Sequence, residues 1–396
     1  MNMRIPVTMK LLNSPGAVPF ALLAALNSSS LAVMSTVLTL KALELLGDSR
    51  DVSLVYTTVA GTTLVTRFAV PQLIRLFRRR WVYSAGAAMV GLSPFLVATN
   101  TLTGQVAGMI LQVFGAACAH ITLNLYIMDF ISRRDFVKSE PLKLAFTALP
   151  WTLGPSVGVL LYQDVSAWAV YGVSSTFSIG TLGYFWFLRL SDDPTVRPAK
   201  GPPPNPLRYL HRFFVQQPRL RLAWWIAFGR DTWWQMLMIY GPLYMVTSGE
   251  PDAYAGYLVS AGLAMLALGP IYGWIGRRVR LRRVIMTAFA FAGLMSLATL
   301  AAYHRPLVAA GCILLGTAAV AGLDAVGGVP FLRAVHKHER AEMTVVYTTF
   351  GNAARFSSTA VFSLLLSVFD LHAVFLVTAL GMFAFCWISR HVPKGM

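Results

Sequence analysis

The stretch SDDPTVRPAKGPPPNPLRYLHRFFVQQPRL, from Ser191 to Leu220, interrupts an otherwise apolar chain almost at its centre. It is rich in proline, including the run Pro202–Pro204, and it carries several basic residues. Each proline lacks an N–H donor and clashes with the preceding turn, so this density of proline disfavours a helix. The stretch therefore predicts an extended basic linker. It divides the chain into an N-terminal half (1–190), the linker (191–220) and a C-terminal half (221–396).

The composition on both sides of the linker is that of a membrane protein. Hydrophobic residues make up 56% of the chain and charged residues only 12%, about half of the charged fraction of a soluble domain. Apolar runs of about 18 residues or more recur along the whole length, which indicates membrane-spanning helices. A large soluble core is excluded because too little polar sequence remains to cover it.

The apolar runs predict an all-α polytopic membrane protein with twelve transmembrane helices in two pseudo-symmetric six-helix bundles. The expected spans are residues 17–46, 52–74, 81–98, 105–131, 144–162, 167–188, 221–246, 254–276, 284–302, 307–332, 345–369 and 372–389.

The distribution of basic residues predicts the orientation. The net charge is +17, and 27 of the 33 Lys and Arg residues fall at the termini, in the linker and in the loops after every second helix. The other side holds only Lys41, Arg50 and Arg305. This is the positive-inside pattern, so we expect a multi-pass protein of the cytoplasmic (inner) membrane of a bacterium with both termini cytoplasmic. The basic residues form no single patch, which argues against a nucleic-acid partner.

The two halves repeat each other. The run Arg75-Leu-Phe-Arg-Arg-Arg80 aligns with Arg277-Arg-Val-Arg-Leu-Arg282 at an offset of 202 residues. Two halves in the same orientation indicate parallel repeats about an axis along the membrane normal.

With these features the chain resembles the major facilitator superfamily over nearly its whole length. The loop signature G-x-x-x-D-R/K-x-G-R/K-R/K of that family corresponds to residues 71–80 and 273–282, which keep the basic tail but have Arg75 and Arg277 at the acidic position. Residues 150–159 resemble the G-x-x-x-G-P-x-x-G-G signature of proton-driven exporters, with Pro150 and Val159 departing from it. Gly154, Pro155 and Gly158 retain its centre, and the alternative interpretation is a generic helix-packing motif.

Ionisable residues inside the apolar runs are the candidate transport residues, because charges in a bilayer are costly and usually face a cavity or one another. The resemblance implies that helices 1, 4, 7 and 10 line a cavity framed by 2, 5, 8 and 11. The candidates fall on these helices: Arg67, His120, Asn124, Arg230, Trp234, Gln235 and Arg355 for substrate binding, and Asp231 and Asp324 for proton coupling.

Each candidate also has a structural interpretation. His120 is compatible with a satisfied core histidine, and Arg67 lies near enough to a helix end to snorkel. Asp324 and Arg355 are candidates for an inter-helix ion pair. Trp233 is a further candidate for stacking on a substrate. Gly241-Pro242 is a predicted bending point for a gate, as Gly154, Pro155 and Gly158 are for packing and gating.

The leading hypothesis is a secondary transporter that moves a small organic solute by alternating access, with proton-coupled efflux favoured by the signature around Gly154. An importer or exchanger of an organic anion, such as a carboxylate or phosphate compound, is the alternative suggested by the intramembrane arginines. A membrane-embedded transferase using the run His336–Arg340, or a non-transporting assembly factor, are further alternatives.

We expect no enzymatic activity, because a solvated loop accounts better for His336–Arg340 and the chain contains no phosphate-binding loop for ATP. Cys118, Cys312 and Cys386 have no metal-ligand spacing, so no metal and no cofactor are expected. The expected partners are a small-molecule substrate, protons and the lipid bilayer, and the protein is expected to be a monomer.

Overall fold

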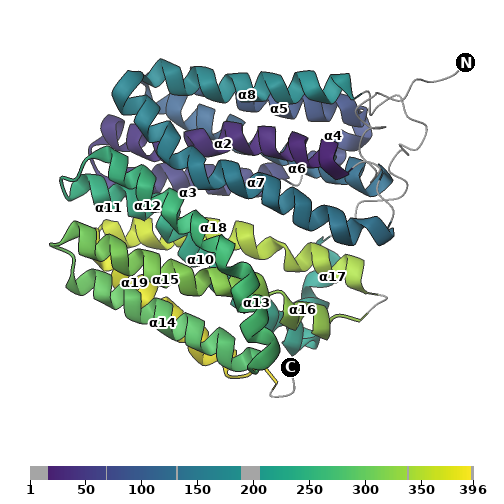
Figure 1. Cartoon of the computed structure of the whole chain (residues 1–396), viewed down its shortest axis with the longest axis vertical. Coiled ribbons are helices and arrows are strands. Elements are labelled where there is room, and N and C mark those ends of the chain that lie inside the picture. Colours follow the sequence, from purple (N-terminus) through teal and green to yellow (C-terminus); the bar gives the residue numbers. More distant parts are fainter. Residues whose placement is uncertain (1–16, 68, 131–132, 189–205, 337–338, 394–396) are drawn as a thin grey trace, which may run out of the picture. The chain divides into compact units, whose positions relative to one another are not determined.

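The computed structural model describes residues 17–67, 69–130, 133–188, 206–336 and 339–393, and within these ranges it contains helices and no strand (Figure 1). In hydrocarbon every backbone N–H and C=O group needs a partner, and a helix provides all of them within one segment. Seven described stretches are long and apolar enough to cross a membrane: Val18–Leu46, Leu102–Phe130, Lys143–Val165, Asp252–Gly276, Leu281–Ala301, Pro306–Ala334 and His372–Ser389.

Contacts divide the chain into two compact units. Unit 1 comprises Met1–Leu45 and Gly61–Gly201. Its described helices are α2 (Ala17–Leu46), the end of α3 (Ser49–Arg67), α4 (Val70–Leu76), α5 (Arg79–Val97), α6 (Leu102–Phe130), α7 (Arg133–Leu160), its π-helical continuation η1 (Leu161–Val165), and α8 (Ala167–Phe187). Within this unit α5 packs against both α6 and α8.

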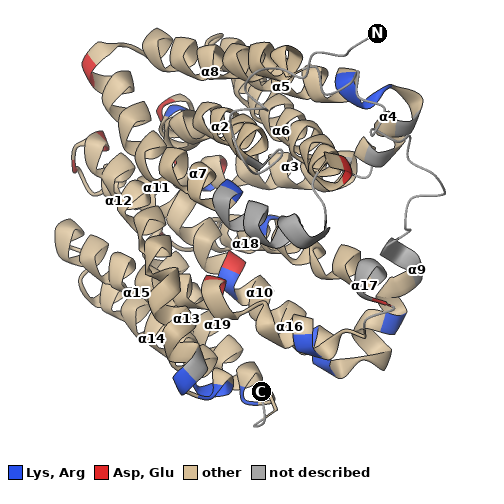
Figure 2. Ribbon diagram, turned by 45° about the vertical axis from the view of Figure 1, so that its right-hand side comes forward, with Lys and Arg blue, Asp and Glu red and all other residues tan. Residues whose placement is uncertain are grey.

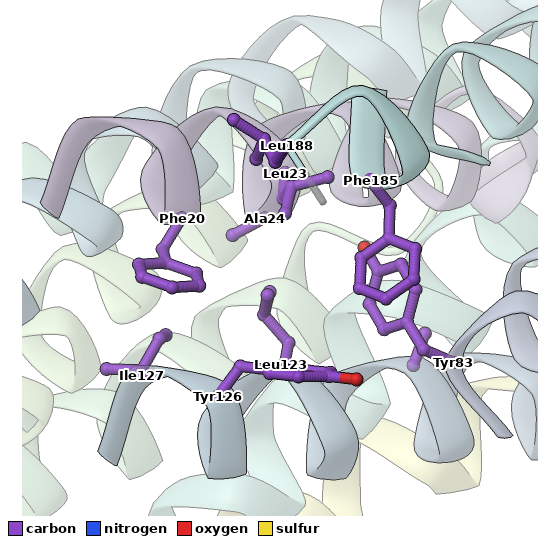
Figure 3. Packing of buried hydrophobic residues seen from close by; sticks show 10 residues of the cluster. Phe20, Leu23, Ala24, Tyr83, Leu123, Tyr126, Ile127, Phe185 and Leu188 are labelled. Atoms are coloured by element: carbon purple, nitrogen blue, oxygen red, sulfur yellow. The ribbon is translucent and has the colours of Figure 1, made fainter. Parts of the chain in front are cut away.

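An aromatic and aliphatic cluster joins four elements of unit 1 (Figure 3). Phe20 and Leu23 of α2 face Leu123 of α6, and the ring of Tyr83 on α5 stacks on Phe185 of α8 with centroids 4.3 Å apart. Lipid tails are as apolar as leucine, so close packing rather than exclusion of water stabilises such a cluster.

Small residues let the helices of unit 1 approach closely. A Cβ atom added at Gly86 of α5 would lie 2.7 Å from the carbonyl oxygen of Gly115 on α6, too close for any side chain. Serine hydroxyls add inter-helix hydrogen bonds: Ser178 of α8 donates to the Ala87 carbonyl at 2.7 Å. Both features are typical of packing between membrane helices.

Unit 2 comprises Leu46–Ala60 and Pro202–Met396. Its elements after α3 are α9 (Pro206–His211), η3 (Arg212–Gln216), α10 (Pro218–Gln235), η4 (Met236–Tyr240), α11 (Gly241–Thr247), α12 (Asp252–Ala264), η5 (Met265–Leu268), α13 (Gly269–Arg278), α14 (Leu281–Ala301), α15 (Pro306–Val326), α16 (Val329–Ala334), α17 (Arg340–Tyr347), α18 (Thr349–Leu366) and α19 (His372–Ser389). Helix α14 packs between α15 and α19.

The first part of α3 groups with unit 2 rather than with the rest of its helix. There the hydroxyls of Ser53 and Tyr240 form a hydrogen bond, and Ser53 also lies 3.2 Å from the carbonyl oxygen of Thr359 on α18. The predicted division at residues 190 and 220 stays a prediction.

Several predicted helices contain breaks. Within the predicted spans 52–74, 221–246, 254–276 and 307–332 a new helical segment begins at α4, α11, α13 and α16, and each has a proline in its first turn. A proline ring removes one backbone hydrogen bond and crowds the preceding turn, so the helix widens or kinks just before it. The π-helical turn η4 before Pro242 and the 3₁₀ turn η5 before Pro270 are two such distortions.

The prediction of an extended linker is wrong for its second part. Helices α9 and η3 cover Pro206–Gln216, and α10 already begins at Pro218. Phe213 is fully buried in a cluster with Leu220, Trp224 and Phe331, so this part of the linker packs against unit 2. The other part, through residue 205, lies outside the described residues.

The two loops related by the 202-residue offset have the same backbone conformation. Between α4 and α5, Phe77 has φ −116° and ψ 150°, and between α13 and α14, Val279 has φ −111° and ψ 146°. The residues that follow, Arg78 and Arg280, are also extended in both copies, and the next helices begin at Arg79 and Leu281. Helices α5 and α14 thus begin after loops of the same backbone conformation.

Candidate functional site

A charged group on α10 and α15 lies within unit 2. The Nε atom of Arg230 is 3.2 Å from Oδ1 of Asp324, and the indole Nε1 of Trp234 donates a hydrogen bond of 2.8 Å to Oδ2 of the same carboxylate. Arg230 and Trp234 are four residues apart on α10, so they lie on the same helix face. The side chain of Asp324 is 30% exposed and that of Arg230 14%, which leaves the carboxylate accessible to a small ligand.

The pairing of Arg230 with Asp324 is electrostatic rather than a well-aligned hydrogen bond. Although the two atoms are 3.2 Å apart, Nε of Arg230 has no hydrogen-bond partner of good geometry among the described residues. Charge attraction depends only weakly on direction, whereas a hydrogen bond loses strength steeply when bent. This pair can therefore separate without the loss of a directed bond.

Helix α18 brings further groups to the same place. The guanidinium of Arg230 lies 5.2 Å from the ring centroid of Phe350, a cation–π distance. Asp231 borders α18 where Gly351 has no side chain, and its charge interacts with both Arg230 and Arg355. Figure 2 shows acidic and basic residues side by side around α10. Arg230, Asp231, Asp324, Phe350 and Arg355 are hereafter the charge cluster of unit 2.

The predicted ion pair between Asp324 and Arg355 is wrong. Asp324 pairs with Arg230, while the charge of Arg355 interacts with the carboxylate of Asp231. The reason is that α10 contacts both α15 and α18. Arg230 lies between Asp324 of α15 and Phe350 of α18, whereas Asp231 borders α18 at Gly351.

Two further predicted residues are buried against protein. Trp233 is fully buried, donates to Thr317 Oγ1 at 3.0 Å, and lies against Gly316, whose missing side chain makes room for the indole ring. It packs the helices, so the suggested stacking of Trp233 on a substrate is wrong. Gln235 is also buried; its proposed role in substrate binding stays a prediction.

Unit 1 contains a second polar group, on α6 and α7. His120 Nδ1 and Asn124 Nδ2 are 3.5 Å apart, one turn from each other on α6. The ammonium of Lys143 on α7 donates a 3.1 Å hydrogen bond to Oδ1 of Asn124. His120 is exposed rather than enclosed in the core.

Lys143 was missed by the sequence analysis, which assigned it to the loop before a helix starting at residue 144. Helix α7 in fact begins at Arg133 and continues across Pro141. The apolar run of residues 144–162 gave no sign that the helix begins earlier. The candidate residue Arg67 is the last residue of α3, its side chain lies outside the described part, and its role stays a prediction.

The glycines of the exporter-like signature form a close contact within unit 1. A Cβ atom at Gly158 would collide with the backbone of Val33 on α2, and one at Gly154 would meet Ala32. Pro155 between them is buried. In unit 2, Gly241 and Pro242 lie where the π-helical turn η4 ends and α11 begins, at the position of the predicted bend. Their roles in gating stay predictions.

The run His336–Arg340 was predicted to be a solvated loop, and this prediction is wrong for Glu339. Glu339 is buried and accepts hydrogen bonds from Arg212 and from Gln217 Nε2, the latter at 3.0 Å. Residues 337 and 338 lie outside the described residues. No group of three or more His, Cys, Asp and Glu residues in the described chain could hold a metal ion.

Comparisons with known proteins agree with this architecture. The family model of the Major Facilitator Superfamily matches residues 20–322. A crystal structure of the nucleoside transporter NupG is similar with a TM-score of 0.76 at 13% identity, covering 95% of this chain and 98% of the other. The peptide transporter POT in complex with sulfate has a TM-score of 0.75 at 12% identity, with 94% and 93% covered.

A bacterial homologue of the iron transporter ferroportin has a TM-score of 0.73 at 12% identity, with 94% and 97% covered. At these identities the likeness concerns the fold alone. No curated protein sequence matches the chain.

Proposed function

Because this chain belongs to the major facilitator superfamily, and is thus a multi-pass membrane protein and a secondary transporter rather than an enzyme, we propose that it exports a small organic solute in exchange for protons. We place it in the cytoplasmic membrane with both termini inside, on the strength of the distribution of Lys and Arg.

The observation that carries the proposal is the environment of Asp324. Its carboxylate lies on an apolar helix, is held by Arg230 and Trp234, and remains 30% exposed. Ionisable residues at such positions usually serve transport, because structure alone is achieved at lower cost by apolar side chains. Asp324 is therefore our candidate for the proton carrier.

The charges around Asp324 explain how a proton and a substrate could exclude each other. The two arginines and two aspartates of the charge cluster sum to zero when both carboxylates are ionised. A proton on Asp324 would leave the cluster with one positive charge and free Arg230 to turn to its neighbour Asp231. In surroundings of low dielectric constant, that charge would repel a cationic group of a substrate. Alternate occupancy by proton and substrate is what exchange requires.

Two features support an organic substrate and export. Trp234 and Phe350 place aromatic rings beside the charged groups, which favours a ligand that combines a polar group with an apolar body. Gly154 and Gly158 pack closely against α2, which is the kind of helix contact that the small residues of the exporter-like signature permit.

The proposal is tested with purified protein in liposomes that contain a pH-sensitive dye. A panel of cationic, neutral and anionic compounds is added outside. An exchanged compound enters as protons leave, so the lumen becomes more alkaline. Liposomes without protein provide the baseline. A panel in which no compound alkalinises the lumen through the protein would contradict proton exchange.

The second candidate function is import or exchange of an organic anion, and Lys143 favours it. Its ammonium group reaches Asn124 beside His120, which adds a cation to two residues already predicted to bind substrate. An anion that binds together with a proton would acidify the lumen in the same assay. On this view Lys143→Gln raises the concentration of anion needed for half-maximal flux by about tenfold, the effect of one charge-assisted hydrogen bond.

A further inference from the structure

Two cavities in unit 2 share one arginine, and no residue of the charge cluster lines either of them. The first has a volume of about 570 Å³ and includes Arg212, Gln217, Arg219, Arg333 and Glu339 in its lining. The second has a volume of about 540 Å³ and includes Arg278, Arg280 and Arg333. Arg333, at the end of α16, belongs to both, and we call the two together the basic pocket.

The basic pocket carries an excess of positive charge. Among the described residues that line it, Glu339 is the one carboxylate, and its side chain is only 4% exposed. This carboxylate already accepts hydrogen bonds from Arg212 and Gln217, which attach the end of the linker. Arg219 and Arg333 line the first cavity, Arg280 and Arg333 line the second, and all three residues are exposed.

The surroundings of the basic pocket are those of a membrane interface. Trp274 is 47% exposed and stacks against Arg278, whose guanidinium lies 4.0 Å from the ring centroid. Val279 in the second cavity and Leu332 next to Arg333 are exposed as well. Tryptophan is enriched where headgroups meet acyl chains, and clusters of basic residues there attract anionic lipids.

We propose that the basic pocket binds the phosphate group of an anionic compound in its second cavity, through Arg280 and Arg333. Arginine matches phosphate oxygens with two parallel N–H donors, which is why several arginines around a cavity favour phosphate over a halide or a simple carboxylate. An anionic phospholipid headgroup and a soluble phosphate share this chemistry. The bound group would join α16 to the turn between α13 and α14.

The test uses the full chain in detergent and native mass spectrometry with equal amounts of phosphatidylglycerol and phosphatidylcholine. We expect the anionic lipid to be favoured about fivefold, the effect of one basic residue at a membrane surface, and Arg333→Gln to bring the ratio close to one. Arg305→Gln is the matched control. Arg305 is also exposed, but it lies just before the first residue of α15, whereas Arg333 follows the last residue of that helix.

A second arm identifies the source of the phosphate. Inorganic phosphate is titrated against each protein while its thermal unfolding is followed. If phosphate stabilises the parent but not Arg333→Gln, and both lipids bind equally, the ligand is a soluble phosphate and the site is confirmed. If Arg333→Gln and Arg305→Gln give the parent's lipid ratio and the parent's response to phosphate, the proposal is overturned.

Discussion

At the scale of single residues, the proposed proton exchange depends on how Asp324 is held. Arg230 attracts its carboxylate without a directed hydrogen bond, while Trp234 donates one at 2.8 Å. A charge held mainly by attraction can be released when a proton neutralises its partner, because no directed bond has to be broken. The indole then keeps the neutral carboxyl group in position.

The pairing predicts a specific pattern of stability. Removing one charge with Arg230→Ala or Asp324→Ala leaves the other uncompensated, and we expect each to cost about 2–3 kcal/mol, less than a fully enclosed pair because Asp324 is 30% exposed. The double variant should recover at least half of the summed loss. Thermal unfolding in detergent measures all three.

The same cycle with Arg355→Ala in place of Arg230→Ala serves as the control. Arg355 acts on Asp231 rather than on Asp324, so these losses should add. Equal coupling energies in both cycles would contradict the assigned pairing.

The sequence identified the charged residues of the cluster but not which of them pair with each other. Arg230, Asp231, Asp324 and Arg355 were recognisable because each interrupts an apolar run. Which of them meet depends on the rotation of α10 between α15 and α18, and that rotation is set by packing between helices distant in sequence. Lys143 was missed for a different reason: the polar residues before it resemble a loop, although the helix continues through them.

At the scale of elements, the contact of α7 with α2 depends on Gly158. Its α-hydrogen faces the backbone of Val33, which cannot move aside as a flexible side chain would. Gly158→Ala should therefore cost about 1–3 kcal/mol and lower the unfolding temperature.

Gly172→Ala in α8 is the matched control, since a Cβ atom there meets nothing within 4 Å. This substitution should leave stability unchanged or raise it slightly, because alanine favours a helix. A loss at position 172 as large as at 158 would show that the α2–α7 contact is not the cause.

The end of the linker is a second element with a testable attachment. Glu339 holds Arg212 and Gln217 while Phe213 fills an aromatic cluster. We expect Glu339→Ala to expose the peptide bonds of residues 206–219, so that trypsin cleaves there at least about tenfold faster, the effect of losing one buried charge-assisted contact. The exposed carboxylate Asp370, replaced by asparagine, is the control. Unchanged cleavage in Glu339→Ala would mean that Glu339 does not attach the linker.

The elements themselves were largely predictable, and their breaks were partly so. Apolar runs located the helices, and prolines 71, 242, 270 and 330 mark the places where new segments begin. The sequence could not show how a helix adapts before each proline, because the same residue permits a π-helical turn at η4 and a 3₁₀ turn at η5. The choice depends on the neighbouring helices.

At the scale of the whole molecule, the internal repeat and the distribution of charge predict the topology. Loops related by the 202-residue offset should lie on the same side of the membrane, so Arg78→Cys and Arg282→Cys should both react with a reagent from the cytoplasm. Arg305→Cys should react from outside only. The native cysteines 118, 312 and 386 are free and would be replaced by serine beforehand. Labelling of positions 78 and 282 from opposite sides would contradict the parallel repeat.

The most direct test of proton exchange compares Asp324→Asn with the parent in dye-loaded liposomes, using a compound that alkalinises the lumen with the parent. Asparagine keeps the shape of the side chain but cannot carry a proton. We expect that with the variant the lumen pH no longer changes, and that exchange of labelled for unlabelled cationic compound is also weaker, because a neutral side chain at residue 324 imitates the protonated state that repels the substrate. Asp231→Asn, measured in parallel, shows whether the neighbouring carboxylate shares the role. If Asp324→Asn alkalinises the lumen at the rate of the parent, Asp324 is not the proton carrier and the account is contradicted.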